Sequence, residues 1–450
     1  MNHRSWGDRL GQFRQSLTAN QSLDFRLLSW AALVGFLTGG IGTYLHLGVE
    51  AILAQRERLA NFLVPYPWLY WTVPCLVTMA MVGLSFTLMR RFAPETSGSG
   101  IPQIEGRLMG WFPFHWQRIL PVKFFGGMLS LGSGMAVGFE GPTIQIGGSV
   151  GHMISQWCRA DAEQTRILIA AGAGAGLTSA FNAPLAGILF ITEEVSPHFD
   201  CWPLAYRAVI VASTIATMVE RSLRGQNAVI ALTKFDRVPL ESLWMFVLLG
   251  IFFGLIGYLF NRYLLQTLQW FSQLPPLLYR STGLWVGAVI GFLSLLPIPL
   301  TGSGETVVLW AFNSQAPGHV LLIVFLLRFA LTLFCYGSGA IGGIFAPMLA
   351  IATIGSLGIA RELHLWFPTQ IPHPGALGLA GMGALVAATV QAPLTAILLT
   401  IEMTDNFFVI LPLLVTCLVS TMVAQGLGCR PIYTLLQERL KQHPRHSHHS

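Results

Sequence analysis

Long runs of apolar residues without a single charge follow one another along this chain, and short polar segments separate them. An α-helix of about 20 such residues is long enough to cross the hydrocarbon core of a bilayer. Several runs reach that length, and examples are 27–49, 67–89, 167–192, 281–304, 329–360 and 407–429. The pattern predicts an all-α polytopic membrane protein.

Composition and charge agree with that prediction. Hydrophobic residues make up 53% of the 450 residues and charged residues only 10%, against roughly a quarter in soluble domains. The net charge of +6 comes largely from the ends of the chain, which carry Arg4, Arg9, Arg14 and Arg26, and Arg430, Arg439, Lys441 and Arg445. Basic residues beside spanning segments mark the cytoplasmic side, so we expect both termini there. Nucleic-acid binding would require a basic folded domain, and because the sequence indicates none, we expect no nucleic-acid partner. No cleavable signal peptide is predicted.

Little in the sequence indicates a metal, a cofactor or an enzyme. The six cysteines show no CxxC spacing, and we interpret them as small hydrophobic residues. The tail 443–450, HPRHSHHS, could bind a metal but is better explained as a disordered tail or a purification remnant. The chain contains no HExxH pair, no GxSxG elbow and no Walker loop, so we expect a protein that is not an enzyme.

The chain repeats itself. The segment AGAGAGLTSAFNAPLAGILFITE (171–193) aligns without a gap on AGMGALVAATVQAPLTAILLTIE (380–402), with ten of 23 positions identical and an offset of 209. SGMAVGFEGP (133–142) likewise matches SGAIGGIFAP (338–347) at an offset of 205, and the GSG at Gly98 recurs 204 residues later. Three collinear matches at nearly one offset indicate a duplicated unit.

These matches define the predicted organisation. A cytoplasmic segment, 1–26, precedes a first membrane repeat, 27–221, and a polar linker, 222–241, leads to a second repeat, 242–428. The segment 429–450 would hold a final helix and the basic, His-rich tail. If each repeat crosses the membrane an odd number of times, the second copy is inverted and the termini share a side. Inverted repeats are typical of transporters whose binding site lies near the bilayer midplane.

Glycine followed by proline interrupts the apolar runs at matched places in the two halves. GFEGP and GIFAP each predict a loop that leads into a helix beginning near Pro142 or Pro347. The free N–H groups at a helix N-terminus carry a partial positive charge and bind anions. GSGIPQIEG offers a third such terminus, with a hydroxyl donor at Ser99. Such sites hold a small anion weakly enough to let it pass.

The motifs GSGIPQIEG, GFEGP, GGIFAP and the tyrosine of CRPIY resemble, in order, the four anion-site motifs of the CLC family of chloride channels and chloride/proton antiporters. The resemblance covers about 27–440 and is greatest to the bacterial antiporters. It implies the CLC fold, with two inverted-topology repeats of many tilted and broken helices. It also implies a homodimer with one pathway per subunit, in the inner (plasma) membrane of a bacterium. The cytoplasmic CBS pair of larger members is not expected.

The resemblance also implies roles for particular residues. Chloride would contact the hydroxyls of Ser99 and Tyr433 and the backbone amides of Ile344 and Phe345. Glu140 would be the gating glutamate, which competes with chloride while ionised and swings away once protonated. The resemblance thus implies Ser99, Ile344, Phe345 and Tyr433 as chloride-binding residues. It implies Glu140 for gating and external proton transfer, and Glu194 for internal proton transfer.

The alternatives remain open for several residues. Glu140 and Glu194 could be structural acids, and Tyr433 an interfacial aromatic anchor. Glu193 aligns with Glu402, which favours a structural role for both. Lys123 could pair with Glu105 or with Glu193 instead of acting near chloride.

Some positions depart from the family. Phe139 stands where many relatives have arginine, so the outer mouth loses a positive charge, and Gln103 replaces a frequent second acid. Ser99 favours chloride over nitrate, because nitrate-preferring relatives have proline there. The predicted function is exchange of chloride for protons, and a passive, voltage- or pH-gated chloride channel of the same fold is the alternative. Glu194 discriminates the two, since a channel needs no internal proton donor.

Overall fold

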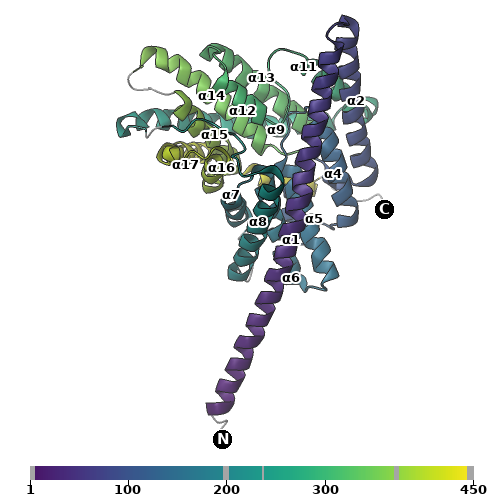
Figure 1. Cartoon of the computed structure of the whole chain (residues 1–450), viewed down its shortest axis with the longest axis vertical. Helices are drawn as coiled ribbons and strands as arrows, with labels where there is room; N and C mark the ends of the chain where they lie inside the picture. Colours follow the sequence, from purple (N-terminus) through teal and green to yellow (C-terminus); the bar gives the residue numbers. More distant parts are fainter. Residues whose placement is uncertain (1–5, 196–201, 236–237, 369–373, 443–450) are drawn as a thin grey trace.

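The structure, a computed structural model, describes residues 6–195, 202–235, 238–368 and 374–442. In that part of the chain it is a bundle of helices without a β-sheet, and its longest element, α1 (Trp6–Leu63), projects at its N-terminal end beyond the rest of the molecule (Figure 1). Because α1 begins at Trp6, residues 6–26 of the predicted N-terminal segment are continuous with the first membrane helix.

Each half contributes a similar series of helices. In the first half, α1 is followed by α2 (Pro67–Phe92), α3 (Ile101–Leu108), α4 (Trp116–Gly132), α5 (Glu140–Trp157), α6 (Ala162–Phe181), α7 (Pro184–Phe190), the π-helical turn η2 (Ile191–Val195) and α8 (Trp202–Arg224). The second half contains α9 (Leu243–Ser272), α10 (Pro276–Arg280), α11 (Thr282–Leu293), α12 (Glu305–Asn313), α13 (Gly318–Gly337), α14 (Phe345–Trp366), α15 (Pro374–Val390), α16 (Pro393–Thr404) and α17 (Ile410–Gly426). A final helix, α18 (Ile432–Gln442), follows.

Six helical segments in the described part of the chain are long and apolar enough to cross a membrane. They are Phe25–Leu63, Pro67–Phe92, Leu240–Ser272, Gly318–Gly337, Phe345–Trp366 and Phe407–Gly426. Three of the predicted runs are not single spanning helices. The run 281–304 forms only the short α11, 329–360 breaks between α13 and α14, and 167–192 breaks between α6 and α7.

The break in 167–192 has a local cause. Asn182 adopts a left-handed conformation, with φ of 50°, and ends α6, and Pro184 then begins α7. Proline has no N–H to donate and suits the first turn of a helix, so the chain restarts there in a new direction. Hydropathy alone records that this run is apolar and misses the change of direction.

The predicted repeat appears in the structure as a two-fold relation between the halves. Gly138 and Gly343, 205 residues apart, form an antiparallel bridge in which each N–H donates to the other's carbonyl at 2.8 Å. Equal and reciprocal bonds between matched residues are what a two-fold axis between them requires. The second half is therefore inverted relative to the first at this point.

Small residues allow the helices within each half to pack closely. α5 and α6 meet at Gly147 and Gly172, where a Cβ on either glycine would collide with the other's backbone carbonyl. In the second half, α14 and α15 meet in the same way at Gly381, where a Cβ would collide with Ser356. Because no large side chain lies between them, helices that meet at such small residues can approach each other closely inside a membrane protein.

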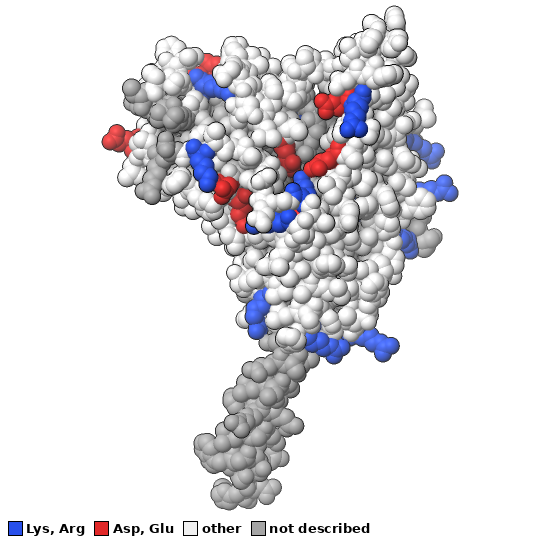
Figure 2. Space-filling view, viewed as in Figure 1, with Lys and Arg blue, Asp and Glu red and all other residues white. Residues whose placement is uncertain are grey.

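Charge is sparse on the surface. Figure 2 shows a largely uncharged face on which acidic side chains occur only in the upper part, while the charged side chains lower down are basic. The predicted linker 222–241 begins within the last turn of α8, which ends at Arg224, and is followed by α9 at Leu243.

Candidate anion site

Two helices begin at the centre of the molecule, and the N–H of one binds the acid of the other. Glu140 is the first residue of α5 and Phe345 the first of α14, each two residues earlier than the predicted starts at Pro142 and Pro347. The Glu140 side chain is fully buried, and its Oε1 accepts a hydrogen bond from the Phe345 N–H at 2.6 Å. A carboxylate thus lies at a helix N-terminus, where an anion is favoured.

Glycine makes room for this carboxylate on both sides. A Cβ on Gly138 or on Gly343 would overlap the Glu140 carboxylate. These are the same two glycines that pair across the two-fold relation, so the bridge between the halves also forms the walls around the acid.

Ser99 reaches the same region from the first half. It lies between Gly98 and Gly100, whose φ angles of 68° and 87° suit only glycine, and it precedes α3. A Cβ on Gly141 would come within 2.7 Å of the Ser99 Cα, which shows how closely this loop approaches the start of α5. The Ser99 Oγ accepts a long bond, 3.4 Å, from the Tyr336 hydroxyl, and among the described residues it donates to no acceptor.

Tyr433, near the start of α18, comes from the opposite end of the chain. Its side chain is fully buried, and its ring lies 6.0 Å from that of Phe345, centroid to centroid. The Tyr433 hydroxyl has no hydrogen-bond partner within the described part of the chain. A buried hydroxyl without a partner is unfavourable unless a ligand uses it, which disfavours the interpretation of Tyr433 as an interfacial anchor.

Ile344 immediately precedes α14 and is fully buried, so its amide belongs to the same N-terminus as that of Phe345. The structure therefore brings together Ser99, Glu140, Phe345 and Tyr433, with Ile344 beside them. Residues that are more than 300 positions apart in the sequence contribute hydroxyls and amides to one buried place.

Glu194 lies in η2, and besides the adjacent Glu193 it has an acidic neighbour from another helix, Glu105 of α3. The two carboxyl groups lie close together. Glu105 is buried, and the sequence offered it only as a partner for Lys123. Tyr433 lies within electrostatic range of both Glu140 and Glu194.

Lys123 pairs with neither predicted acid. Its fully buried ammonium donates to the carbonyl oxygens of Thr96 at 2.9 Å and Gly98 at 2.8 Å. Gln103 contacts the same loop through a bond from its Nε2 to the Ser97 carbonyl at 3.3 Å.

Glu193 and Glu402 each bind the helix of the other half. Glu193 accepts from the N–H groups of Leu394 and Thr395 at the start of α16, at 3.1 and 2.8 Å. Glu402 accepts from Leu185 and Ala186 at the start of α7, at the same two distances. The reciprocal caps agree with the predicted structural role of this pair and place Glu193 directly beside Glu194.

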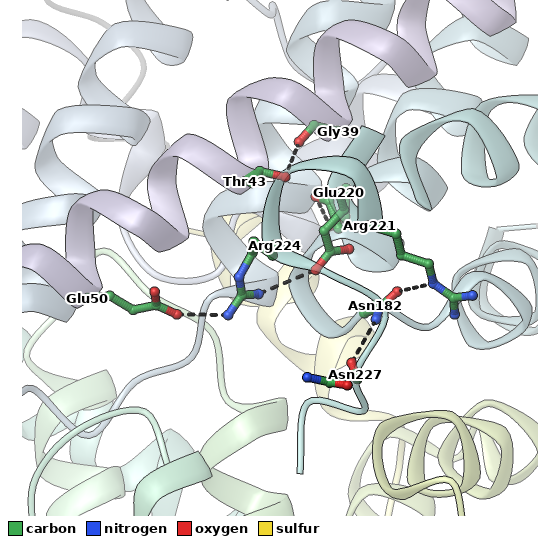
Figure 3. Close-up of polar contacts among 10 residues, drawn as sticks. Gly39, Thr43, Glu50, Asn182, Glu220, Arg221, Arg224 and Asn227 are labelled. Carbon is green, nitrogen blue, oxygen red and sulfur yellow. Dashed lines mark hydrogen bonds and ion pairs between the residues drawn. The ribbon is translucent and has the colours of Figure 1, made fainter. Parts of the chain in front are cut away.

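Phe139 is buried and stacks on His46 of α1 with ring centroids 3.8 Å apart. One turn further along α1, Glu50 accepts from Arg224 at 2.8 Å, and Arg224 also contacts the buried Glu220 at 3.4 Å (Figure 3). The positive charge of Arg224 is therefore offset by Glu50 and Glu220.

The same view shows how α8 is bound to the end of α6 and to the segment that follows α8. Arg221 donates to the Asn182 side chain at 2.9 Å, and Asn182 in turn contacts the Asn227 carbonyl at 3.4 Å (Figure 3). The left-handed residue that ends α6 is thereby held by α8 and by the segment that follows it.

No cluster of three metal-binding side chains occurs within the described ranges. The cysteines in those ranges, Cys75, Cys158, Cys335, Cys417 and Cys429, have free thiols. Cys201 and the His-rich tail 443–450 lie outside the described residues.

Two features were missed in the sequence. Tyr336 donates to Ser99, and although CYGSG places it before a matched glycine motif, nothing local marks it as a neighbour of the first-half loop. The approach of Glu105 to Glu194 joins α3 to η2, and the aligned motifs carry no signal for it.

Comparison with known proteins finds relatives over most of the chain. A sequence model described as voltage gated chloride channel matches residues 80–425. The H(+)/Cl(−) exchange transporter ClcA of Vibrio parahaemolyticus is 42% identical over 436 residues, which cover 96% of this chain and 92% of the relative. The ClcA of Vibrio cholerae is 44% identical over 425 residues, with 92% and 90% covered.

Solved structures are similar over most of their length. The crystal structure of a slow cyanobacterial Cl−/H+ antiporter has a TM-score of 0.90 and 59% identity, and the match covers 92% of this chain and 97% of that one. A eukaryotic CLC transporter has a TM-score of 0.77 at 20% identity, covering 92% of this chain and 74% of that one, and is similar in fold.

Proposed function

Because the chain belongs to the voltage-gated chloride channel family, we propose that it is a secondary transporter that exchanges chloride for protons across a membrane. The observation that carries this proposal is the bond from the Phe345 N–H to the Glu140 carboxylate, inside a region lined by buried hydroxyls. The exchange transporters at 42–44% identity and the antiporter structure at 59% support it.

Glu140 acts as the gate because it is an anion tethered inside an anion site. While it is ionised, its carboxylate occupies the Phe345 amide that chloride needs. Once a proton neutralises it, its attraction to the helix N-terminus falls, the side chain leaves, and chloride binds the amides of Ile344 and Phe345 together with the hydroxyls of Ser99 and Tyr433. Each chloride that enters this position therefore requires a proton on Glu140, which couples the two fluxes.

Glu194 takes the proton at the other end of the path. Its neighbour Glu105 can share a proton with it, so the pair provides a place where a proton waits between solution and Glu140. Glu193 holds the adjacent turn fixed through its bonds to α16, which positions Glu194.

A passive chloride channel of the same fold is the alternative, and an imposed chloride gradient distinguishes the two. In liposomes that contain the purified protein, a chloride gradient should drive protons against their own gradient, and an uncoupler should collapse the movement. Chloride flux with proton movement no greater than that of empty liposomes would establish the channel instead.

The transporter would work as a homodimer in the inner membrane of a bacterium, with both termini cytoplasmic. An apolar groove of about 580 Å³ is lined by residues of α7, α8 and α16, among them Leu185, Ile188, Tyr206, Ile210 and Leu398. It supports the dimer, since large apolar side chains such as Leu185 are exposed there. Cysteine cross-linking at Leu185 tests the dimer, and labelling of an introduced terminal cysteine in sealed vesicles tests the topology.

A further inference from the structure

One buried amide holds the segment that leads into α18. Asn261 on α9 is almost completely shielded from solvent, and its Nδ2 donates to the Thr389 carbonyl, in the last turn of α15, at 3.0 Å. The same Nδ2 donates to the Cys429 sulfur at 3.2 Å and to the Arg430 carbonyl at 3.1 Å. A single side chain therefore connects α9, the end of α15 and the segment between α17 and α18.

Small residues bring these elements within reach of the amide. A Cβ on Gly257, one turn before Asn261 on α9, would lie 2.5 Å from the Cβ of Ala388 on α15. Cys429 packs with Ala388 and Ala424 in a small cluster of buried residues, separate from the main hydrophobic core of the described chain. Because these residues bury little apolar surface, the hydrogen bonds of the junction carry much of its stability.

A second amide holds the same segment. Gln391 follows the last residue of α15 with φ of 64°, a conformation uncommon outside glycine, and its Nε2 donates to the Cys429 carbonyl at 2.6 Å. The Cys429 N–H donates in turn to the Ala424 carbonyl at 3.0 Å. The backbone and the sulfur of Cys429 are thus all bonded, and two of these bonds come from the side chains of Asn261 and Gln391.

Tyr433 depends on this anchor for its position. It is the second residue of α18, four residues after Cys429, and among the described residues its buried hydroxyl has no hydrogen-bond partner that would fix the far end of the side chain. The turn before the anchor gives little support, since Gly428 has φ of 76° and a Cβ there would meet nothing within 4 Å. The place of the hydroxyl is therefore set by packing, such as the ring contact with Phe345, and by the anchored backbone.

We propose that Asn261, assisted by Gln391, is a positioning residue for chloride: it fixes the backbone at Cys429 and thereby the place of the Tyr433 hydroxyl in the anion site. Asn261 acts through Tyr433 and does not itself contact chloride. Its role requires a hydrogen-bond donor, because the three groups that it binds are two carbonyls and a sulfur. This inference rests on the proposed function, in that it takes chloride to be the ligand of the Tyr433 hydroxyl.

A double-mutant cycle separates this role from general destabilisation. Calorimetric titration of the purified full-length protein with chloride should give a Kd raised about threefold by Asn261→Leu and about fivefold by Tyr433→Phe. Because Asn261 acts through the hydroxyl, adding Asn261→Leu to Tyr433→Phe should change the Kd by less than about 1.5-fold. Independent effects would instead multiply to about 15-fold in the double variant.

Ser420→Ala is the matched control. The Ser420 hydroxyl on α17 is fully buried and donates to the Ala384 carbonyl of α15 at 2.9 Å, and in the described part of the chain it makes no hydrogen bond with Cys429 or Arg430. Asn261→Leu and Ser420→Ala should both lower the melting temperature, because each loses a buried hydrogen bond to α15. Only Asn261→Leu should weaken chloride binding, and Ser420→Ala should keep the Kd within about 1.5-fold.

A multiplied loss in the double variant, an unchanged Kd in Asn261→Leu, or an equal loss in Ser420→Ala would overturn the inference. Should Asn261→Leu fail to fold, Gln391→Met removes the other side-chain bond to Cys429 and decides in its place. It should raise the Kd about twofold when Tyr433 is present and leave it unchanged in Tyr433→Phe, and any other result counts against the inference.

Failure of the proposed function has a different signature. An unchanged Kd in Tyr433→Phe alone would contradict the proposed chloride site and, with it, the role of Asn261. Because calorimetry measures chloride binding alone, a protein that shows the expected cycle but moves no protons would contradict the proposed exchange and leave this inference in place.

Discussion

Substitution of Glu140 by glutamine isolates the charge of the gate from its shape. Glutamine fills the same volume, and its amide oxygen can still accept from the Phe345 N–H, where the carboxylate now binds at 2.6 Å. A net hydrogen bond to a charged group contributes about 1.5–3 kcal/mol, and a neutral one about 0.5–1.5 kcal/mol. The tethered competitor should therefore lose about 1–1.5 kcal/mol relative to chloride.

That difference corresponds to roughly a tenfold tighter chloride Kd, because each 1.4 kcal/mol is a factor of ten. Titration calorimetry on the purified Glu140→Gln protein measures it directly, and proton uptake into liposomes should be lost in parallel. Glu140→Asp serves as control, since it keeps the charge but its shorter side chain cannot reach the amide in the same way. If Glu140→Gln binds chloride with unchanged or weaker affinity, the carboxylate does not compete with chloride and the gating argument is refuted.

The remaining predictions concern residues around the site. Glu194→Gln should abolish proton movement and retain chloride flux, and an unchanged coupling ratio in liposomes would remove its role. Tyr433→Phe should raise the chloride Kd about fivefold, from the loss of one hydrogen bond worth about 1 kcal/mol, yet leave the melting temperature unchanged because the hydroxyl has no protein partner in the described chain. Glu402→Ala should lower the free energy of unfolding by about 1–2 kcal/mol through loss of a helix cap, and Glu193→Ala by at least as much. Thermal melts followed by tryptophan fluorescence measure both losses. Destabilisation of only one of the two variants would contradict the two-fold relation.

Much of the site was predictable because it depends on local chemistry. Glycine and proline mark where helices begin, so GFEGP and GIFAP located, to within two residues, the two helix N-termini that meet at Glu140. A structural role for Glu193 and Glu402 followed from the alignment of the halves, and inversion explains why each acid caps the helix of the other half.

The contacts that escaped prediction join distant segments or use the backbone. Lys123 was expected to seek an acid, but its partners are the carbonyls of Thr96 and Gly98, and since every residue has a carbonyl the sequence cannot single these out. The run 167–192 was predicted as one span because hydropathy does not report the left-handed backbone conformation at Asn182. Side-chain pairs such as Glu105 with Glu194 depend on how α3 packs, which no periodicity reports.

The mutual bonds between Gly138 and Gly343 bear on how such a protein could have arisen. Each partner lies in a different half, so neither half alone encloses the acid at Glu140. An ancestral polypeptide with a single copy could have assembled this arrangement only if some molecules entered the bilayer upright and others upside down. Fusion of two genes would then have locked the opposed orientations into one chain.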